Sequence, residues 1–90
     1  MLDILITSKT RVKLLVKFFK DPDTTSYLRE LAEEFNESTN SIRVELNRLV
    51  QANLLTSKSE GFYKIYQANT HHEYYNDLHE IVLKMTKPVE

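Results

Sequence analysis

The chain has 90 residues, a mass of 10.6 kDa and a net charge of −1, from 12 basic and 13 acidic side chains. This length leaves room for one small domain, and 41% hydrophobic with 28% charged residues is a globular composition and not a disordered one. The lack of cysteine excludes disulfides, thiolate metal sites and cysteine nucleophiles, and the apolar runs are far shorter than the roughly 20 residues of a membrane span.

A first helix is predicted over residues 9–20, with Thr7 or Ser8 as its N-cap. One apolar stripe with helical spacing is expected to face the core and carries Val12, Leu15, Val16 and Phe19. Leu14 and Phe18 fall on a different side of this helix. A third stripe is basic and is interpreted as a solvated face or, alternatively, as a contact with the DNA backbone; it carries Lys9, Lys13, Lys17 and Lys20.

A helix-turn-helix unit is predicted over residues 27–52. A short strand at 24–26 leads into a helix over 27–35, which Asn36 ends because asparagine tolerates a left-handed backbone. Ser38 caps a third helix over 39–52, whose inward residues are Ile42, Leu46, Leu49 and Val50. The turn of three residues, 36–38, has the spacing of a helix-turn-helix motif.

A two-stranded wing and a last helix follow. Strands are predicted over 54–58 and 62–67, around a turn at Ser59-Glu60-Gly61, where the only glycine permits a positive φ. The last helix is predicted over 72–85. The expected fold class is α+β, mainly α: a winged helix-turn-helix in a single domain over 1–90, with the order helix, short strand, helix, helix, wing (54–67) and C-terminal helix.

The outer face of the 39–52 helix carries side chains that can read base edges. Arginine bonds two acceptors of guanine, asparagine bonds two atoms of adenine, and a helix N-terminus suits a phosphate. Residues 38–67 hold four basic and two acidic side chains, whereas 21–37 hold one basic and six acidic ones. The alternative is a merely solvated helix face. The predicted DNA-binding residues are Ser26, Tyr27, Arg29, Thr39, Asn40, Ser41, Arg43, Val44, Asn47, Arg48, Lys58 and Lys64.

Two segments carry a family resemblance. TTSYLRELAEEFNESTNSIRVELNRLVQANLLTS (24–57) resembles the helix-turn-helix core of ArsR/MarR-like winged-helix regulators, through YLRELA, STNSIRVELNRL and NLL. KIYQANTHHEYYNDLHEIV (64–82) resembles the hairpin exit and final helix of a small bacterial subgroup, in which His-Pro-Leu stands where this chain has His72-Glu73-Tyr74. The resemblance implies a stand-alone transcriptional regulator that binds double-stranded operator DNA. Metal-sensing relatives carry cysteine pairs that this chain lacks.

The apolar residues exceed what one core of this size is expected to hide, so we predict a homodimer. The alternative is a monomer whose N-terminus folds back over the first helix. We expect a cytoplasmic domain with no membrane contact, no catalytic residues, no metal at His71, His72 or His79, and no cofactor; a small-molecule effector is left open. The rival function is a winged-helix module that docks on another protein without binding DNA. The predicted dimer interface is Leu2, Leu5, Leu14, Phe18, Tyr75, Leu78, Val82 and Met85.

Overall fold

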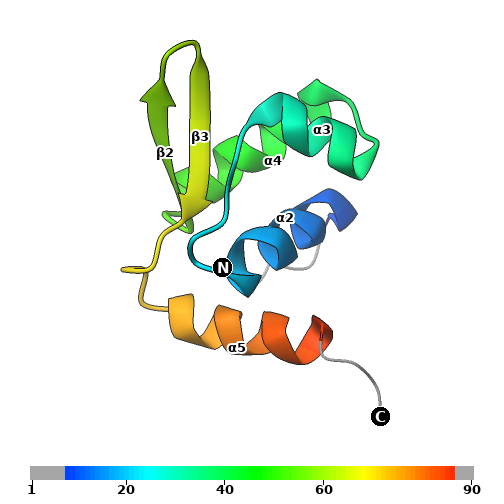
Figure 1. Cartoon of the computed structure of the whole chain (residues 1–90). Coiled ribbons are helices and arrows are strands. Elements are labelled where there is room, and N and C mark those ends of the chain that lie inside the picture. The colour runs from blue at the N-terminus through cyan, green and yellow to red at the C-terminus, as the bar shows by residue number, and fades with distance from the viewer. Residues whose placement is uncertain (1–7, 87–90) are drawn as a thin grey trace.

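The computed structural model of the chain describes residues 8–86, which form four helices and one three-stranded sheet (Figure 1). In chain order the elements are α2 (Lys9–Lys20), β1 (Thr25–Ser26), α3 (Leu28–Phe35), α4 (Thr39–Gln51), β2 (Leu55–Glu60), β3 (Tyr63–Ala68) and α5 (Tyr75–Thr86). This is the predicted winged helix-turn-helix, and the fold class is confirmed. No helix within 8–86 is long and apolar enough to cross a membrane.

Short polar residues set the helix boundaries, as the sequence indicated. The Ser8 and Ser38 hydroxyls accept hydrogen bonds from the backbone N–H groups of Arg11 and Ser41, at 3.2 and 3.1 Å. Asn36 ends α3 with a φ of 54°, and Asn53 follows α4 with a φ of 61°. These left-handed residues reverse the chain after each helix, so that α3 and α4 pack against each other as a pair.

The sheet is antiparallel in the order β1–β3–β2. Its β2–β3 hairpin pairs Leu55 with Ala68 at its base and Glu60 with Tyr63 at its far end, which leaves a loop of Gly61 and Phe62. Gly61 has a φ of 63° and Phe62 has no positive φ, the pattern of a type II′ turn. The predicted turn was therefore one to two residues too early, and Phe62 lies at the tip instead of inside the second strand.

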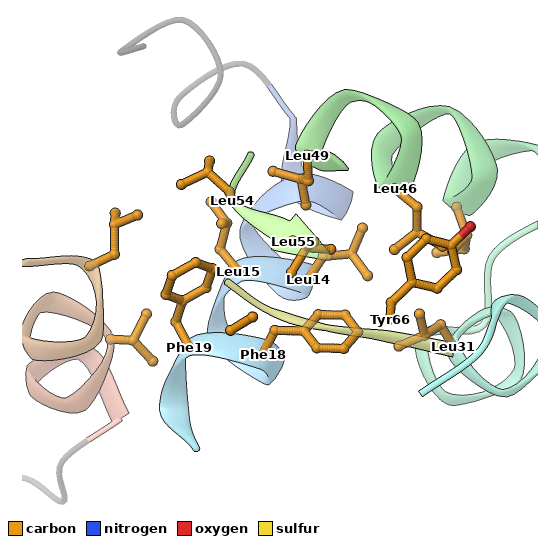
Figure 2. Packing of buried hydrophobic residues seen from close by; sticks show 14 of the residues in the cluster. Leu14, Leu15, Phe18, Phe19, Leu31, Leu46, Leu49, Leu54, Leu55 and Tyr66 are labelled. Atoms are coloured by element: carbon orange, nitrogen blue, oxygen red, sulfur yellow. The ribbon is translucent and has the colours of Figure 1, made fainter. Parts of the chain in front are cut away.

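Helix α2 lies at the centre of the core and is buried on more than one side. Phe19 lies toward α5, and the centroid of its ring is 5.5 Å from the centroid of the Tyr75 ring. Phe18 extends toward Leu31 and Tyr66 (Figure 2). The fully or nearly buried apolar residues of this helix are Leu14, Leu15, Phe18 and Phe19, while Val12 and Val16 are half-buried. A helix that is apolar around much of its circumference belongs inside a fold.

This packing corrects most of the predicted dimer interface. Leu14 and Phe18 are 0% exposed in the core of a single chain. Tyr75, Leu78 and Val82 are also buried, because they form the face of α5 that packs on α2. These five side chains are core residues and not surplus surface. Met85 is exposed, and Leu2 and Leu5 lie outside the described residues.

Candidate nucleic-acid interface

Helix α4 has one buried and one exposed face. Ile42, Leu46 and Leu49 are 0% exposed and anchor the helix on the core, while Val50 is half-buried. This inner face agrees with the sequence analysis. The opposite side is open to solvent and carries Thr39, Asn40, Ser41, Arg43, Val44, Asn47 and Arg48.

A groove of about 640 Å³ lies between α4, the start of α3 and the wing. It brings together six of the predicted DNA-binding residues: Tyr27, Arg29, Thr39, Arg43, Asn47 and Lys64. The remaining wall consists of Leu28, Phe62, Tyr63 and Tyr66. Side chains from three parts of the chain thus converge on one polar and aromatic surface.

The groove is rich in cations whose charge is not neutralised locally. Arg29, Arg43 and Lys64 form no ion pair with any other residue in the range 8–86. Burial raises the pKa of the Tyr66 phenol, and the neighbouring Arg43 opposes this by lowering it. Tyr66 therefore stays neutral at ordinary pH, and the charge of this surface is positive.

Aromatic contacts hold the wing against the start of α3. The rings of Tyr27 and Tyr63 are 5.1 Å apart, and Tyr27 is the N-cap residue of α3 without using its side chain as a cap. Such ring pairs contribute about 0.5–1.5 kcal/mol beyond their buried area. Tyr27, a predicted DNA contact, is half-buried against Tyr63 while still lining the groove.

Two predicted contact residues lie elsewhere. Ser26 is 2% exposed, and its hydroxyl hydrogen-bonds to a Glu30 carboxylate oxygen at 2.5 Å, so it is not available to a phosphate and its assignment was wrong. Lys58 pairs with Ile65 whereas Lys64 pairs with Ser59, one rung further along, so the two lysines lie on opposite faces of the hairpin. Only Lys64 lines the groove.

A buried ion pair beneath α4 was not recognised from the sequence. Arg11 Nε lies 2.5 Å from Glu45 Oε2, and these side chains are only 3% and 10% exposed. Arg48 Nη1 is a more distant neighbour of Glu45, at 3.8 Å, and is itself exposed. Glu45 is adjacent to Leu46 and three residues from Ile42, so helical spacing places it near the inner face of α4. A charged residue at such a position was the signal in the sequence for a buried partner. The pair leaves the outer face of α4 with Arg43 and Arg48 and without an acidic residue.

The histidines do not form a cluster with other ligand types. Within residues 8–86 no group of three His, Asp or Glu side chains is arranged to hold a metal ion. His79 Nδ1 lies 2.6 Å from the Phe19 carbonyl oxygen and stacks on Tyr75, which places it in the α2–α5 packing.

Comparison with solved structures gives the same fold at low sequence identity. Two structures of HlyU from Vibrio cholerae N16961, one of them of the reduced protein, superpose with a TM-score of 0.78 and 15% identity. Each match covers 97% of this chain and 85% or 88% of the HlyU chain. No protein-family model and no curated protein matches the sequence. The likeness therefore concerns the fold of nearly the whole chain.

Proposed function

We propose that this chain is a sequence-specific, double-stranded-DNA-binding transcriptional regulator. The observation that carries the proposal is the groove in which α4, the α3 N-terminus and the wing present three cations without local acidic partners. An α-helix fits the major groove of B-DNA, and α4 offers a mostly polar, solvent-exposed face for that purpose.

Two kinds of contact follow from the positions of the side chains. Arg43 and Asn47, one turn apart on α4, take the role of base readers, because their planar groups can form two hydrogen bonds with guanine and adenine. Arg29 at the start of α3 and Lys64 on the wing lie at the margins of the same groove and take the role of phosphate contacts. Lys58, on the other face of the wing, is a further candidate for a phosphate contact.

A homodimer on α5 belongs to this proposal, through a surface that keeps Met85 of the first predicted interface without its buried residues. Ile81, Leu83 and Met85 are 52%, 43% and 60% exposed. Ile81 and Met85 are four residues apart and share one flank of α5, whereas Leu83 lies on another side of the helix. A two-fold pair through Ile81 and Met85 would present two α4 helices, and we expect half-sites about one DNA turn apart.

The rival is a protein-docking module, and the observation that favours it is the same exposed face of α5. A module of this kind uses α5 to bind another protein and leaves the groove solvated. Only the first of the two functions requires the chain to bind duplex DNA, so one DNA-binding experiment distinguishes them.

The test is an electrophoretic shift on a duplex that the wild-type chain selects from a random library. Arg43→Ala and Asn47→Ala are each expected to weaken binding by about 1–3 kcal/mol and to relax the preference at one base position. Lys84→Ala, which removes an exposed positive charge from α5, is the control and should leave both unchanged. Failure to select any duplex, or equal binding by all variants, contradicts the proposed function.

A further inference from the structure

The tip of the wing carries an unusually exposed aromatic ring. Phe62 is 104% exposed, and it follows Gly61, around which a Cβ atom would meet nothing within 4 Å. The turn at Gly61 and Phe62 is therefore open to solvent, although Tyr63 beside it stacks on Tyr27. Figure 1 shows the hairpin projecting at the end of the molecule away from α5. Phe62 also lines the groove next to α4, so the tip belongs to the proposed DNA-facing side.

The strand register places one lysine on each face of the hairpin behind this tip. Lys58 pairs with Ile65, and Ser59 pairs with Lys64, so the two cations occupy adjacent rungs and point to opposite faces. A hairpin that enters a groove of duplex DNA has one phosphate backbone on each side. Lysines on both faces suit this environment, whereas a hairpin lying flat on one backbone would use only one of them.

We propose that Phe62 is an apolar wedge that enters the minor groove of bound duplex DNA and partly unstacks one base step, with Lys58 and Lys64 against the two flanking backbones. The inference rests on the proposed function and adds to it a second point of contact, in a different groove, which deforms the DNA. Wedges of this kind kink the duplex toward the major groove and favour flexible pyrimidine–purine steps.

The reach of the hairpin is compatible with two neighbouring grooves. Tyr66 lies near Arg43 of α4, and Phe62 stands four residues before Tyr66 in the chain, toward the tip of the hairpin. At roughly 3.3 Å per residue the tip lies about 13 Å beyond Tyr66. Adjacent major and minor grooves are half a turn apart, about 17 Å. The two lengths are similar, and the Phe62 side chain extends beyond the backbone of the tip. With α4 in the major groove, the tip is therefore directed toward the next minor groove.

One neighbour opposes the contact and provides an independent check. Glu60 pairs with Tyr63 at the last rung and lies on the same face as Lys58. Its carboxylate is brought toward the phosphates when the tip inserts, and like charges repel. Glu60→Gln should therefore tighten DNA binding if the tip inserts, and should change nothing if the tip stays in solvent.

The experiment measures affinity and bending with the full chain. The probe is a duplex selected by the wild-type protein from a random library and labelled at both ends for energy transfer, and the variants are Phe62→Ala, Phe62→Leu, Glu60→Gln and Tyr74→Ala. Tyr74→Ala removes another exposed aromatic ring outside the groove and is the matched control. Burial of one phenylalanine favours binding by about 10- to 100-fold and unstacking opposes it, so Phe62→Ala should lose about tenfold in affinity.

Phe62→Ala should also leave the duplex nearly straight, whereas the wild type bends it by at least about 20°. Its preference for the selected sequence over one altered at the bases read by α4 should remain that of the wild type. Phe62→Leu should retain part of the bend, and Tyr74→Ala all of it. Equal bending by the wild type and Phe62→Ala, or no bending by the wild type, overturns the wedge while leaving α4 as the reader.

Two further results are also decisive. A wild-type chain that binds no duplex removes the proposed function and the wedge together. Phe62→Ala that binds DNA normally but has a smaller mass in solution makes Phe62 a protein contact and overturns the wedge alone.

Discussion

The buried pair Arg11–Glu45 links the central helix α2 to α4, and its removal should be costly. Glu45→Gln keeps the shape of the side chain but removes the carboxylate whose Oε2 lies 2.5 Å from Arg11 Nε, while the other contacts of Arg11 remain. Losing a hydrogen bond between charged groups in a buried site costs about 1.5–3 kcal/mol. Whole domains are stable by only about 5–15 kcal/mol, so this substitution removes a large share of the total.

The matched control is the exposed pair Lys17–Glu34. Its nitrogen–oxygen distance is 2.8 Å, but its side chains are 24% and 45% exposed, so Lys17→Met should cost at most about 1 kcal/mol. Urea unfolding followed by circular dichroism measures both free energies of unfolding. If Glu45→Gln loses no more stability than Lys17→Met, solvent screens the Arg11–Glu45 pair and the reasoning from its burial is wrong.

Other consequences of the packing can be measured with single variants. Phe18→Ala should destabilise the monomer by about 3–5 kcal/mol, because Phe18 is a core residue; a change in oligomeric mass without a loss of stability would return it to an interface. Ile81→Asp on the exposed face of α5 should shift the solution mass measured by light scattering from dimer to monomer, with the unfolding midpoint nearly unchanged; a monomeric wild type would refute the α5 pairing. The raised pKa of Tyr66 means that the folded state holds the phenolic proton more tightly than the unfolded chain does. Its contribution to stability is complete below pH 10.0 and is lost as the pH rises through the folded pKa. Burial also raises the pKa of Tyr75, so an ultraviolet titration of Tyr66→Phe should show one tyrosine fewer that ionises above pH 10.0 than the wild type, not none.

Local signals in the sequence were enough for the elements of the fold. The serine caps at Ser8 and Ser38 and the left-handed Asn36 and Asn53 act within a few residues of themselves, so the helix boundaries agree within about two residues for α2, α3 and α4. The last helix begins at Tyr75 instead of residue 72, after turns at 70–74.

Long-range packing explains what the sequence did not reveal. An apolar stripe identifies one inward face, but α2 is covered by α4, α5 and β3, so Leu14 and Phe18 are as buried as Phe19. Arg11 and Glu45 are 34 residues apart, and no periodicity connects them. Serine is a common helix-capping residue, but Ser26 lies in strand β1 and pairs with Tyr66 of β3.

At the candidate site, the sequence identified the residues of α4 but not their partners on the wing. Arg43 and Asn47 follow from helical spacing alone. Phe62 was missed because the position of the turn depends on the register of two strands, which brings it to the tip. The same register puts Lys58 and Lys64, both predicted as contacts, on opposite faces of the hairpin. A glycine followed directly by an aromatic residue between two strands was the signal available.

The most direct test of the account removes one hydrogen-bond acceptor from the DNA. Guanines in the selected duplex are replaced one at a time by 7-deazaguanine, which lacks the major-groove N7 acceptor, and the affinities of the wild type and Arg43→Ala are compared. With Arg43 bonded to a guanine edge, one replacement should weaken wild-type binding by about tenfold and leave Arg43→Ala unaffected. An equal loss for both proteins, or no loss at any guanine, would contradict a reading role for the exposed face of α4.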